Sequence, residues 1–348
     1  MPELTERQKF ILTLIIHEYI RTAAPIASEN LVKSYHLDMS SATVRNEMAI
    51  LTDLGYLRKQ HSFSGRVPTE EGYRLFVGRL IQETDLPATT RLNISHQFFQ
   101  MRNDVEQWMR LAASVLARQS RAASLITAPH PQQPRIKHIE LISTRGRQVL
   151  MVLVMAGGEI QQRILSLAEP VSQEQLSGTA ALLTQLYQNK DLASVTLPPN
   201  LDPLALDVIE WIKEEMRQAE SLVSGEIYLD GLTNVLAEPE FSGSQEARRA
   251  LRVLEERPLL QDLLSRTVMT GEVGGVQVLI GGEGTWQDLR QSSIVLARYG
   301  APGLMTGTLG VLGPMRMPYG RTISTVRFLA ELLSELVTDT LVEDEGTQ

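Results

Sequence analysis

The chain has 348 residues, 43% of them hydrophobic and 21% charged, as expected for a folded protein of two or three domains. It contains no cysteine, which excludes disulfides and thiolate metal sites and leaves no sign of an oxidising compartment. The net charge of −8 belongs to the later part of the chain: residues 1–80 hold ten Lys and Arg against nine Asp and Glu, so a local basic surface for phosphate is permitted there.

The apolar run at Phe10–Ile16 is too short for a membrane span, which needs roughly 18 apolar residues. Glu3 and Glu6 cancel the basic residues before this run and Glu18 follows it, so a secretory signal is not indicated. We expect a cytoplasmic protein with no membrane partner.

Two helices are predicted at the start of the chain. Apolar residues recur at helical spacing through residues 5–21, with Thr5 placed to cap the N-terminus and Pro25 forbidding continuation. A second, shorter helix begins at Ser28, and its apolar residues are expected to point inward: Leu31, Val32 and Tyr35.

A third helix is predicted from Ser41 to Leu54, and it stops at Gly55, a residue suited to a left-handed C-terminal cap. On a helical wheel one narrow face should pack against the first helix, and it holds Val44, Met48 and Leu51. Helix, short turn and helix at this spacing are typical of a helix-turn-helix.

The opposite face of the third helix carries side chains suited to a major groove. Thr43 can touch a thymine methyl, Asn46 can make a bidentate contact to adenine, and Arg45 can do the same to guanine or hold a phosphate. Ser40 and Ser41 lie at the helix N-terminus, where hydroxyls and free amides favour phosphate. Taken alone, such a face is more often that of an ordinary surface helix.

A β-hairpin is predicted between Tyr56 and Thr69, with Gly65 in its polar tip. Its basic and titratable side chains are candidates to grip the DNA backbone or minor groove, namely Arg58, Lys59, His61 and Arg66. A charged hairpin by itself is usually only solvated. Placed directly after a helix-turn-helix, it predicts a winged-helix DNA-binding domain, followed by a helix capped by Thr69 and a linker at 85–90.

The remaining chain alternates helical and strand-like blocks. A helix is predicted over 91–119, an antiparallel meander over 136–143, 148–155 and 159–167, and helices over 171–189, 204–222 and 244–266. Strands return at 276–280, 293–298 and 308–312, before a final helix over 321–341. This order indicates one α+β domain with a second domain inserted into it.

Several long segments closely resemble the HrcA family of heat-inducible repressors. The signature region matches SSATVRNEMAILTDLGYL (40–57) and SGRVPTEEGYRLFV (64–77), and the N-terminal LTERQKFIL and APIASENL fit as well. Near the other end, the family's GVIGPTRM-type segment resembles GTLGVLGPMRMPYGR (307–321), with IGGE (280–283) before it and a looser match around DGLTNVL (230–236).

The resemblance implies a multidomain α+β protein with three parts. These are an N-terminal winged helix-turn-helix domain at 1–85, a discontinuous GAF-like domain at 91–170 and 271–348, and an inserted, mostly helical dimerisation domain at 171–270. It also implies a nucleoid-associated repressor of chaperone (heat-shock) operons that binds an inverted-repeat operator in double-stranded DNA as a homodimer. The GroE chaperonin is expected to keep it active, so that unfolded protein, by occupying the chaperonin, releases repression.

No cofactor, metal or catalytic site is expected. The glycine-rich segments at 281–284 and 307–313 lack the GxGxxG order and the Walker lysine, the six His never fall at i, i+3 or i, i+4, and no Ser lies in a nucleophile elbow. Two alternatives stay open. One is a metabolite-responsive winged-helix regulator that senses a small ligand through its GAF-like domain, and the other is an enzyme whose winged helix mediates protein contacts only.

Overall fold

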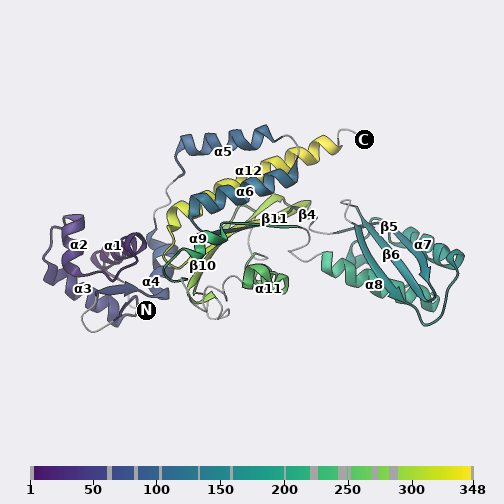
Figure 1. Cartoon of the computed structure of the whole chain (residues 1–348), viewed down its shortest axis with the longest axis horizontal. Coiled ribbons are helices and arrows are strands. Elements are labelled where there is room, and N and C mark those ends of the chain that lie inside the picture. Colours follow the sequence, from purple (N-terminus) through teal and green to yellow (C-terminus); the bar gives the residue numbers. More distant parts are fainter. Residues whose placement is uncertain are drawn as a thin grey trace. The chain divides into compact units, whose positions relative to one another are not determined.

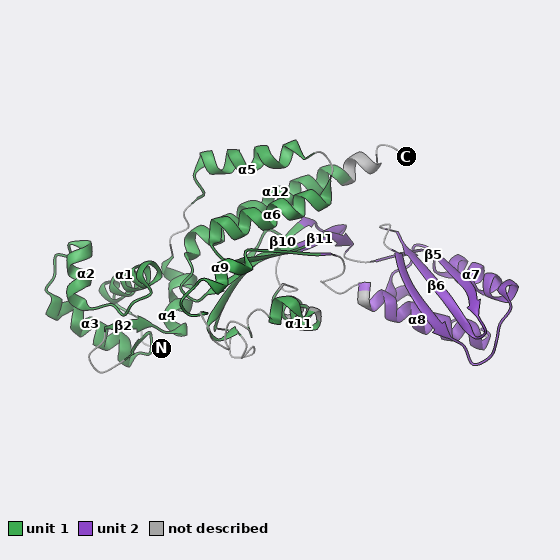
Figure 2. Cartoon of the chain, in the orientation of Figure 1, with its two compact units in different colours: residues 1–128, 227–299, 308–348 green, residues 129–226, 300–307 purple. Residues whose placement is uncertain are grey.

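The computed structural model groups the chain into two compact units (Figures 1 and 2). Unit 1 comprises residues 1–128, 227–299 and 308–348, and unit 2 comprises residues 129–226 and 300–307. The structure describes residues 4–60, 65–81, 85–101, 104–131, 134–156, 160–199, 201–219, 226–241, 249, 252–268, 273–281 and 289–345. Within these ranges no helix is long and apolar enough to cross a membrane.

Unit 1 begins with three helices, α1 (Glu6–Thr22), α2 (Ser28–Tyr35) and α3 (Ser41–Asp53). The predicted cap at Thr5 is confirmed: its hydroxyl accepts from the Gln8 amide, while the Gln8 side chain accepts from the Thr5 amide, a capping box. The prediction that Tyr35 points inward is wrong. Its ring lies at the surface, because the hydroxyl reaches the Glu18 carboxylate at 3.4 Å instead of the core.

A two-stranded hairpin follows, β1 (Leu57–Lys59) paired antiparallel with β2 (Arg66–Pro68). Gly65 lies in the segment that joins the two strands, as predicted, directly before Arg66. It lies beside Ile26, where an added Cβ would come within 2.2 Å of the Ile26 carbonyl oxygen. Ile26 and Arg66 each donate a backbone hydrogen bond to the other, and these two bonds hold the two backbone segments close together. Glycine is therefore required by close packing of two backbones.

The next helices are α4 (Glu70–Leu75), which Thr69 caps as predicted, and a short π-helix, η1 (Phe76–Leu80). The single helix predicted over 91–119 is wrong, because the structure has two: α5 (Ala88–Gln100) and α6 (Val105–Ser120). Asp104 starts α6 by accepting from the Gln107 amide, and the Trp108 indole donates to the Met101 carbonyl across the break. A local cap thus overrides the continuous helical pattern.

The sheet of unit 1 runs in the order β8 (Ile227–Asp230), β3 (Ala123–Thr127), β11 (Met305–Pro314), β10 (Ser292–Ala301) and β9 (Val276–Ile280). In unit 2, β4 (His130–Pro131) pairs with the first two residues of β11, Met305 and Thr306. The pairings of β3 with β8 and β11, and of β9 with β10, are antiparallel. Helices α6 and α12 (Tyr319–Glu345) lie together along the sheet, while α9 (Leu232–Leu236) and α11 (Arg257–Val268) complete the unit (Figure 1). The strands predicted near 276, 293 and 308 are confirmed, and β3, β4 and β8 are additional.

Unit 2 is a meander of β5 (Ile136–Arg145), β6 (Gln148–Met155) and β7 (Ile160–Ser166) with α7 (Gln173–Tyr187), a 3-10 turn η2 (Leu192–Ser194) and α8 (Pro203–Ala219). One face of the meander forms a core with the two helices, which includes Leu141, Met151, Leu183 and Ile209. The expected domain boundary at 170/171 therefore falls inside this compact unit. The physical reason is that β5–β7 bury their inner face against α7 and α8.

Candidate nucleic-acid interface

Helix α3 is held in place by one apolar face, as predicted. Val44, Met48 and Leu51 are buried against α1 and α2. A polar anchor adds to this face, since the Gln8 amide of α1 donates to the Glu47 carboxylate at 3.1 Å. The packing leaves the other side of α3 exposed.

That exposed side carries the residues predicted to read DNA. Arg45 and Asn46 are exposed, and Thr43 and Ser41 are half-buried. The Arg45 guanidinium lies 3.6 Å from the Glu29 carboxylate of α2, and both side chains are about two-thirds exposed. An exposed pair of this kind contributes only about 0–1 kcal/mol, so a phosphate or a guanine edge can replace Glu29.

Ser40 is the N-cap of α3. Its hydroxyl accepts from the Thr43 amide at 3.1 Å and lies 2.9 Å from the Thr43 hydroxyl. These two side chains therefore organise the helix start, and the free amides of the first turn point outward at the positive end of the helix dipole. The arrangement favours a phosphate at this end of α3.

The hairpin residues have different surroundings. Arg58 and Lys59 are exposed on β1, whereas His61 lies outside the described residues. Arg66 is half-buried at the start of β2, opposite Lys59, and its Nε donates to the Thr52 hydroxyl of α3 at 2.9 Å. Arg66 is thus part of the framework that joins the hairpin to α3.

The charge of Arg58 also acts within the protein. Burial raises the pKa of the Tyr19 hydroxyl on α1, Glu240 raises it further, and the charges of Arg58 and Arg316 oppose the rise. Arg58 therefore lies within electrostatic range of the C-terminal end of α1.

Two residues of the three-helix module were not singled out from the sequence. Thr52 receives Arg66, and Lys33 is an exposed cation in the last turn of α2. Lys33 could have been found by the rule that the first helix of a helix-turn-helix crosses the DNA backbone. Thr52 has no comparable local signal, because its partner is set by the hairpin.

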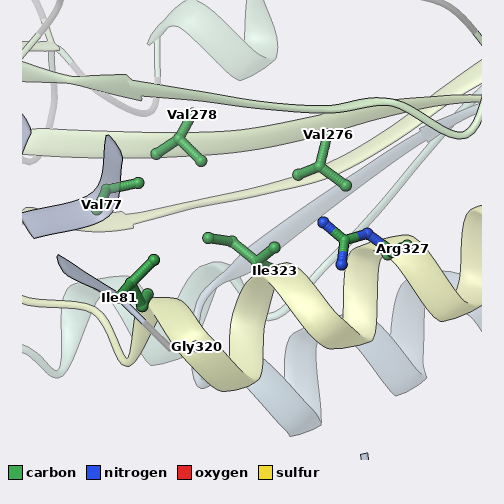
Figure 3. Close-up of a pocket in the computed structure, with 7 residues that line it drawn as sticks. All are labelled: Val77, Ile81, Val276, Val278, Gly320, Ile323 and Arg327. Atoms are coloured by element: carbon green, nitrogen blue, oxygen red, sulfur yellow. The ribbon is translucent and has the colours of Figure 1, made fainter. Parts of the chain in front are cut away.

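A cavity of about 300 Å³ lies elsewhere in unit 1, between η1, β9 and the first turns of α12 (Figure 3). Its walls carry Val77, Ile81, Val276, Val278 and Ile323, and the Arg327 guanidinium lies at one end. A second cavity of about 590 Å³ shares Ile81 and Gly320 and extends along α1 to Phe10. Apolar walls with a few polar groups are typical of small-ligand sites.

Comparison with known proteins identifies the chain's relatives. A family described as HrcA protein C terminal domain matches residues 106–323. The protein named heat-inducible transcription repressor HrcA from Roseiflexus castenholzii is 42% identical over 346 residues, covering 97% of this chain and 95% of the relative. Its namesakes from Herpetosiphon aurantiacus and Dehalococcoides mccartyi are 41% and 33% identical, again over 97% of this chain and 96% of each relative.

Among solved structures, one of a hypothetical protein matches 97% of this chain and 98% of its own, with a TM-score of 0.60 and 22% sequence identity. This likeness extends over nearly the whole chain and concerns the fold alone.

Proposed function

The chain belongs to the HrcA family of heat-inducible transcription repressors and is a negative regulator of heat-shock genes, and we propose that it acts by placing α3 in the major groove of an inverted-repeat operator of chaperone operons. The observation that carries the proposal is the exposed face of α3, on which Arg45 and Asn46 project from a helix held by a buried opposite face. Arginine can donate two hydrogen bonds to a guanine edge, and asparagine can donate one hydrogen bond to an adenine edge and accept one from it.

In this proposal residues 1–85 form a winged helix-turn-helix domain. Thr43, Arg45 and Asn46 contact bases, while Ser40 and Ser41 hold a phosphate at the N-terminus of α3. The wing residues Arg58, Lys59 and His61 contact the backbone or minor groove, and Arg66 supports them from the start of β2. The exposed position of Lys33 supports a further phosphate contact by α2.

We assign the GAF-like domain to the strands and helices of unit 1 that follow this module, and the dimerising domain to unit 2. The basis is an apolar outer face on the meander of unit 2. Register places Ile142, Leu150 and Ile164 in one row across β5, β6 and β7, and a parallel row joins His138, Val154 and Ile160; the row between them consists of Glu140, Val152 and Gln162. Of these, Ile142, Ile160 and Ile164 are 41%, 57% and 65% exposed.

An aliphatic sheet face of this kind supports homodimer formation. The inner face of the same sheet already packs on α7 and α8, so the outer face has no core of its own unit to enter. Covering it with the same face of a second copy brings identical aliphatic rows together about a two-fold axis, which an inverted-repeat operator also requires.

The proposal includes the GroE chaperonin as the partner that keeps the repressor active, and the cytoplasmic nucleoid as its location. Large apolar side chains at the surface of α5 support a chaperonin interaction, since Leu92 and Phe99 are 69% and 65% exposed, one heptad apart. No catalytic role is part of the proposal, and the relatives are named as repressors.

The test is fluorescence anisotropy with a duplex that carries the family's inverted repeat and a scrambled duplex of equal length, with and without chaperonin. We expect the repeat to be bound about 10³-fold or more tightly than the scrambled duplex at physiological salt, and chaperonin to increase the bound fraction. Equal, weak binding to both duplexes that falls steeply with salt would mean contact with phosphates only and would contradict the operator proposal.

A second candidate function, sensing of a small ligand, is favoured by the cavity between η1, β9 and α12 and by its neighbour between α1, η1 and α12. Their apolar walls and the Arg327 guanidinium suit an apolar molecule with an acidic group. The two functions separate in the same assay: a ligand-responsive regulator changes its operator affinity with a small molecule in the absence of chaperonin.

A further inference from the structure

One arginine joins the N-terminal helices of unit 1 to its sheet domain. Arg316 lies in the turn between β11 and α12, and only 12% of its side chain is exposed. Its Nη1 donates to the Ile20 carbonyl of α1 at 3.4 Å. That carbonyl belongs to the last turn of α1, where carbonyl oxygens have no partner within the helix and carry the negative end of the helix dipole.

Two carboxylates hold this arginine in position. Its Nε donates to one oxygen of Glu240 at 2.5 Å, its Nη2 approaches the other oxygen at 3.1 Å, and Nη2 also pairs with Glu238. Both acids follow α9, so they belong to the sheet domain. The bidentate geometry fixes the plane of the guanidinium and aims its remaining donor at α1.

Further contacts cross the same junction. The rings of Tyr73 on α4 and Tyr319 on α12 lie 6.0 Å apart, and both are almost fully buried. Nη2 of Arg74 donates to the Ile280 carbonyl of β9 at 3.3 Å. These contacts press α4 against the sheet domain, whereas Arg316 contacts α1, the helix on which α3 packs.

We infer that Arg316 is a positioning residue that sets the angle at which α3 is presented, and with it the spacing of the operator half-sites. The inference rests on the proposed function, because spacing has meaning only for a dimer that reads two half-sites. Capping α1 from the sheet domain fixes the rotation of the whole three-helix module, since the buried face of α3 and the Gln8–Glu47 hydrogen bond make α1 and α3 move together.

The physical consequence concerns avidity. Linking two reading helices raises affinity about 10²–10⁴-fold over one helix, but only where the linkage matches the distance between half-sites. A rigid junction gives a large gain in operator affinity at one half-site spacing and a steep loss of affinity at other spacings. A loose junction lowers the highest affinity and broadens the range of spacings that are bound.

The test compares the full-length wild type with Arg316→Met on an isolated half-site and on inverted repeats whose spacer changes by up to about 5 base pairs, half a helical turn. We expect half-site affinity to stay within about twofold of the wild type and the preference for the best spacer over the worst to fall about tenfold.

A second variant combines Arg316→Met with Glu238→Gln and Glu240→Gln, which removes the repulsion that the two acids would otherwise exert on each other. It should show the same loss of spacer preference. Arg321→Met is the matched control, because this arginine bonds Gln119 on α6.

A direct measure of orientation accompanies the binding assay. The chain has no cysteine, so Ser34→Cys on α2 and Ser114→Cys on α6, both exposed, allow a pair of spin labels in protein diluted with unlabelled chains. The inter-label distance distribution should be narrow in the wild type and broader in Arg316→Met. An unchanged distribution together with an unchanged spacer preference would overturn the inference. Absence of specific half-site binding by the wild type would instead contradict the proposed function, and the distance distribution would still decide the role of Arg316.

Discussion

The candidate reading residues differ in how firmly the protein holds them. Arg45 is tied only to the exposed Glu29 at 3.6 Å, and Asn46 projects from the same turn of α3. Arg66, which has the same side chain as Arg45, is anchored at 2.9 Å to Thr52 inside the module. A side chain that must adapt to a base edge needs exposed, weakly bonded surroundings such as those of Arg45. A framework residue needs a fixed partner, as Arg66 has in Thr52.

Substitution of Arg45 or Asn46 by Ala should therefore abolish specific operator binding and leave the dimer intact. Each bidentate base contact contributes about 1–3 kcal/mol, and the dimer loses two of them. Fluorescence anisotropy on the operator and on scrambled DNA measures the loss, and size-exclusion chromatography with light scattering measures the dimer.

Arg79→Ala is the control, because it removes an exposed positive charge from η1, outside α3. Unchanged operator affinity in both Arg45→Ala and Asn46→Ala would rule out α3 as the reading helix. If Arg79→Ala weakened specific binding as strongly as Arg45→Ala, the effect would be one of net charge.

At the level of elements, the hairpin depends on a close approach to the turn between α1 and α2. Ile26 and Arg66 exchange backbone hydrogen bonds of 2.9 and 2.8 Å, and Gly65 has no room for a side chain beside the Ile26 carbonyl. The start of β2 is thus attached through Arg66 on two sides, to the turn through Ile26 and to α3 through Thr52. Orientation of the hairpin relative to α3 follows from these attachments.

Gly65→Ala should destabilise the module by about 1–3 kcal/mol, because the new methyl group must displace backbone. Thermal unfolding followed by circular dichroism measures the change. Gly78→Ala in η1 is the control: nothing lies within 4 Å of its added Cβ, and Ala is the better helix former, so stability should stay the same or rise. Equal stability of Gly65→Ala and wild type would show that the backbone between Ile26 and Gly65 adapts without cost.

For the whole molecule, the surface on which the proposed dimer depends is the outer face of the meander in unit 2. Aliphatic side chains of three strands stand in register on it in two rows, on either side of a row that holds Glu140 and Gln162, and exposed aliphatic side chains grouped in this way mark an interaction site. Loss of the interface would leave single reading domains, which lack the bivalent gain of about 10²–10⁴-fold in operator affinity.

Ile164→Asp should convert the dimer to monomer at micromolar concentration, since burying one carboxylate per protomer in an apolar contact without a partner costs several kcal/mol. Analytical ultracentrifugation measures the oligomer, and the operator assay should show the loss of bivalent gain. Leu182→Asp on the exposed surface of α7 is the control for a charge introduced into unit 2. A dimer that survives Ile164→Asp would place the interface elsewhere.

The sequence by itself determined the elements whose signals are local. Thr5 and Thr69 cap their helices as predicted, and the apolar face of α3 follows directly from its helical period, because caps and periodicity depend on residues within one or two turns. The exposed face that carries Arg45 and Asn46 follows from the same pattern. The meander and the strands near 276, 293 and 308 were predicted for an equivalent reason, from short apolar runs bounded by turn residues.

Tertiary structure alone decided which of these pieces meet. Strand β3 pairs with β8 about a hundred residues away, the meander packs on α7 and α8, and Arg316 reaches a carbonyl 296 residues earlier in the chain. The anchoring of Arg66 by Thr52 is of the same kind. Such contacts arise when distant segments bury surface together, so their partners are set by the packed fold, whereas a helix cap or an amphipathic face is set by its own neighbours.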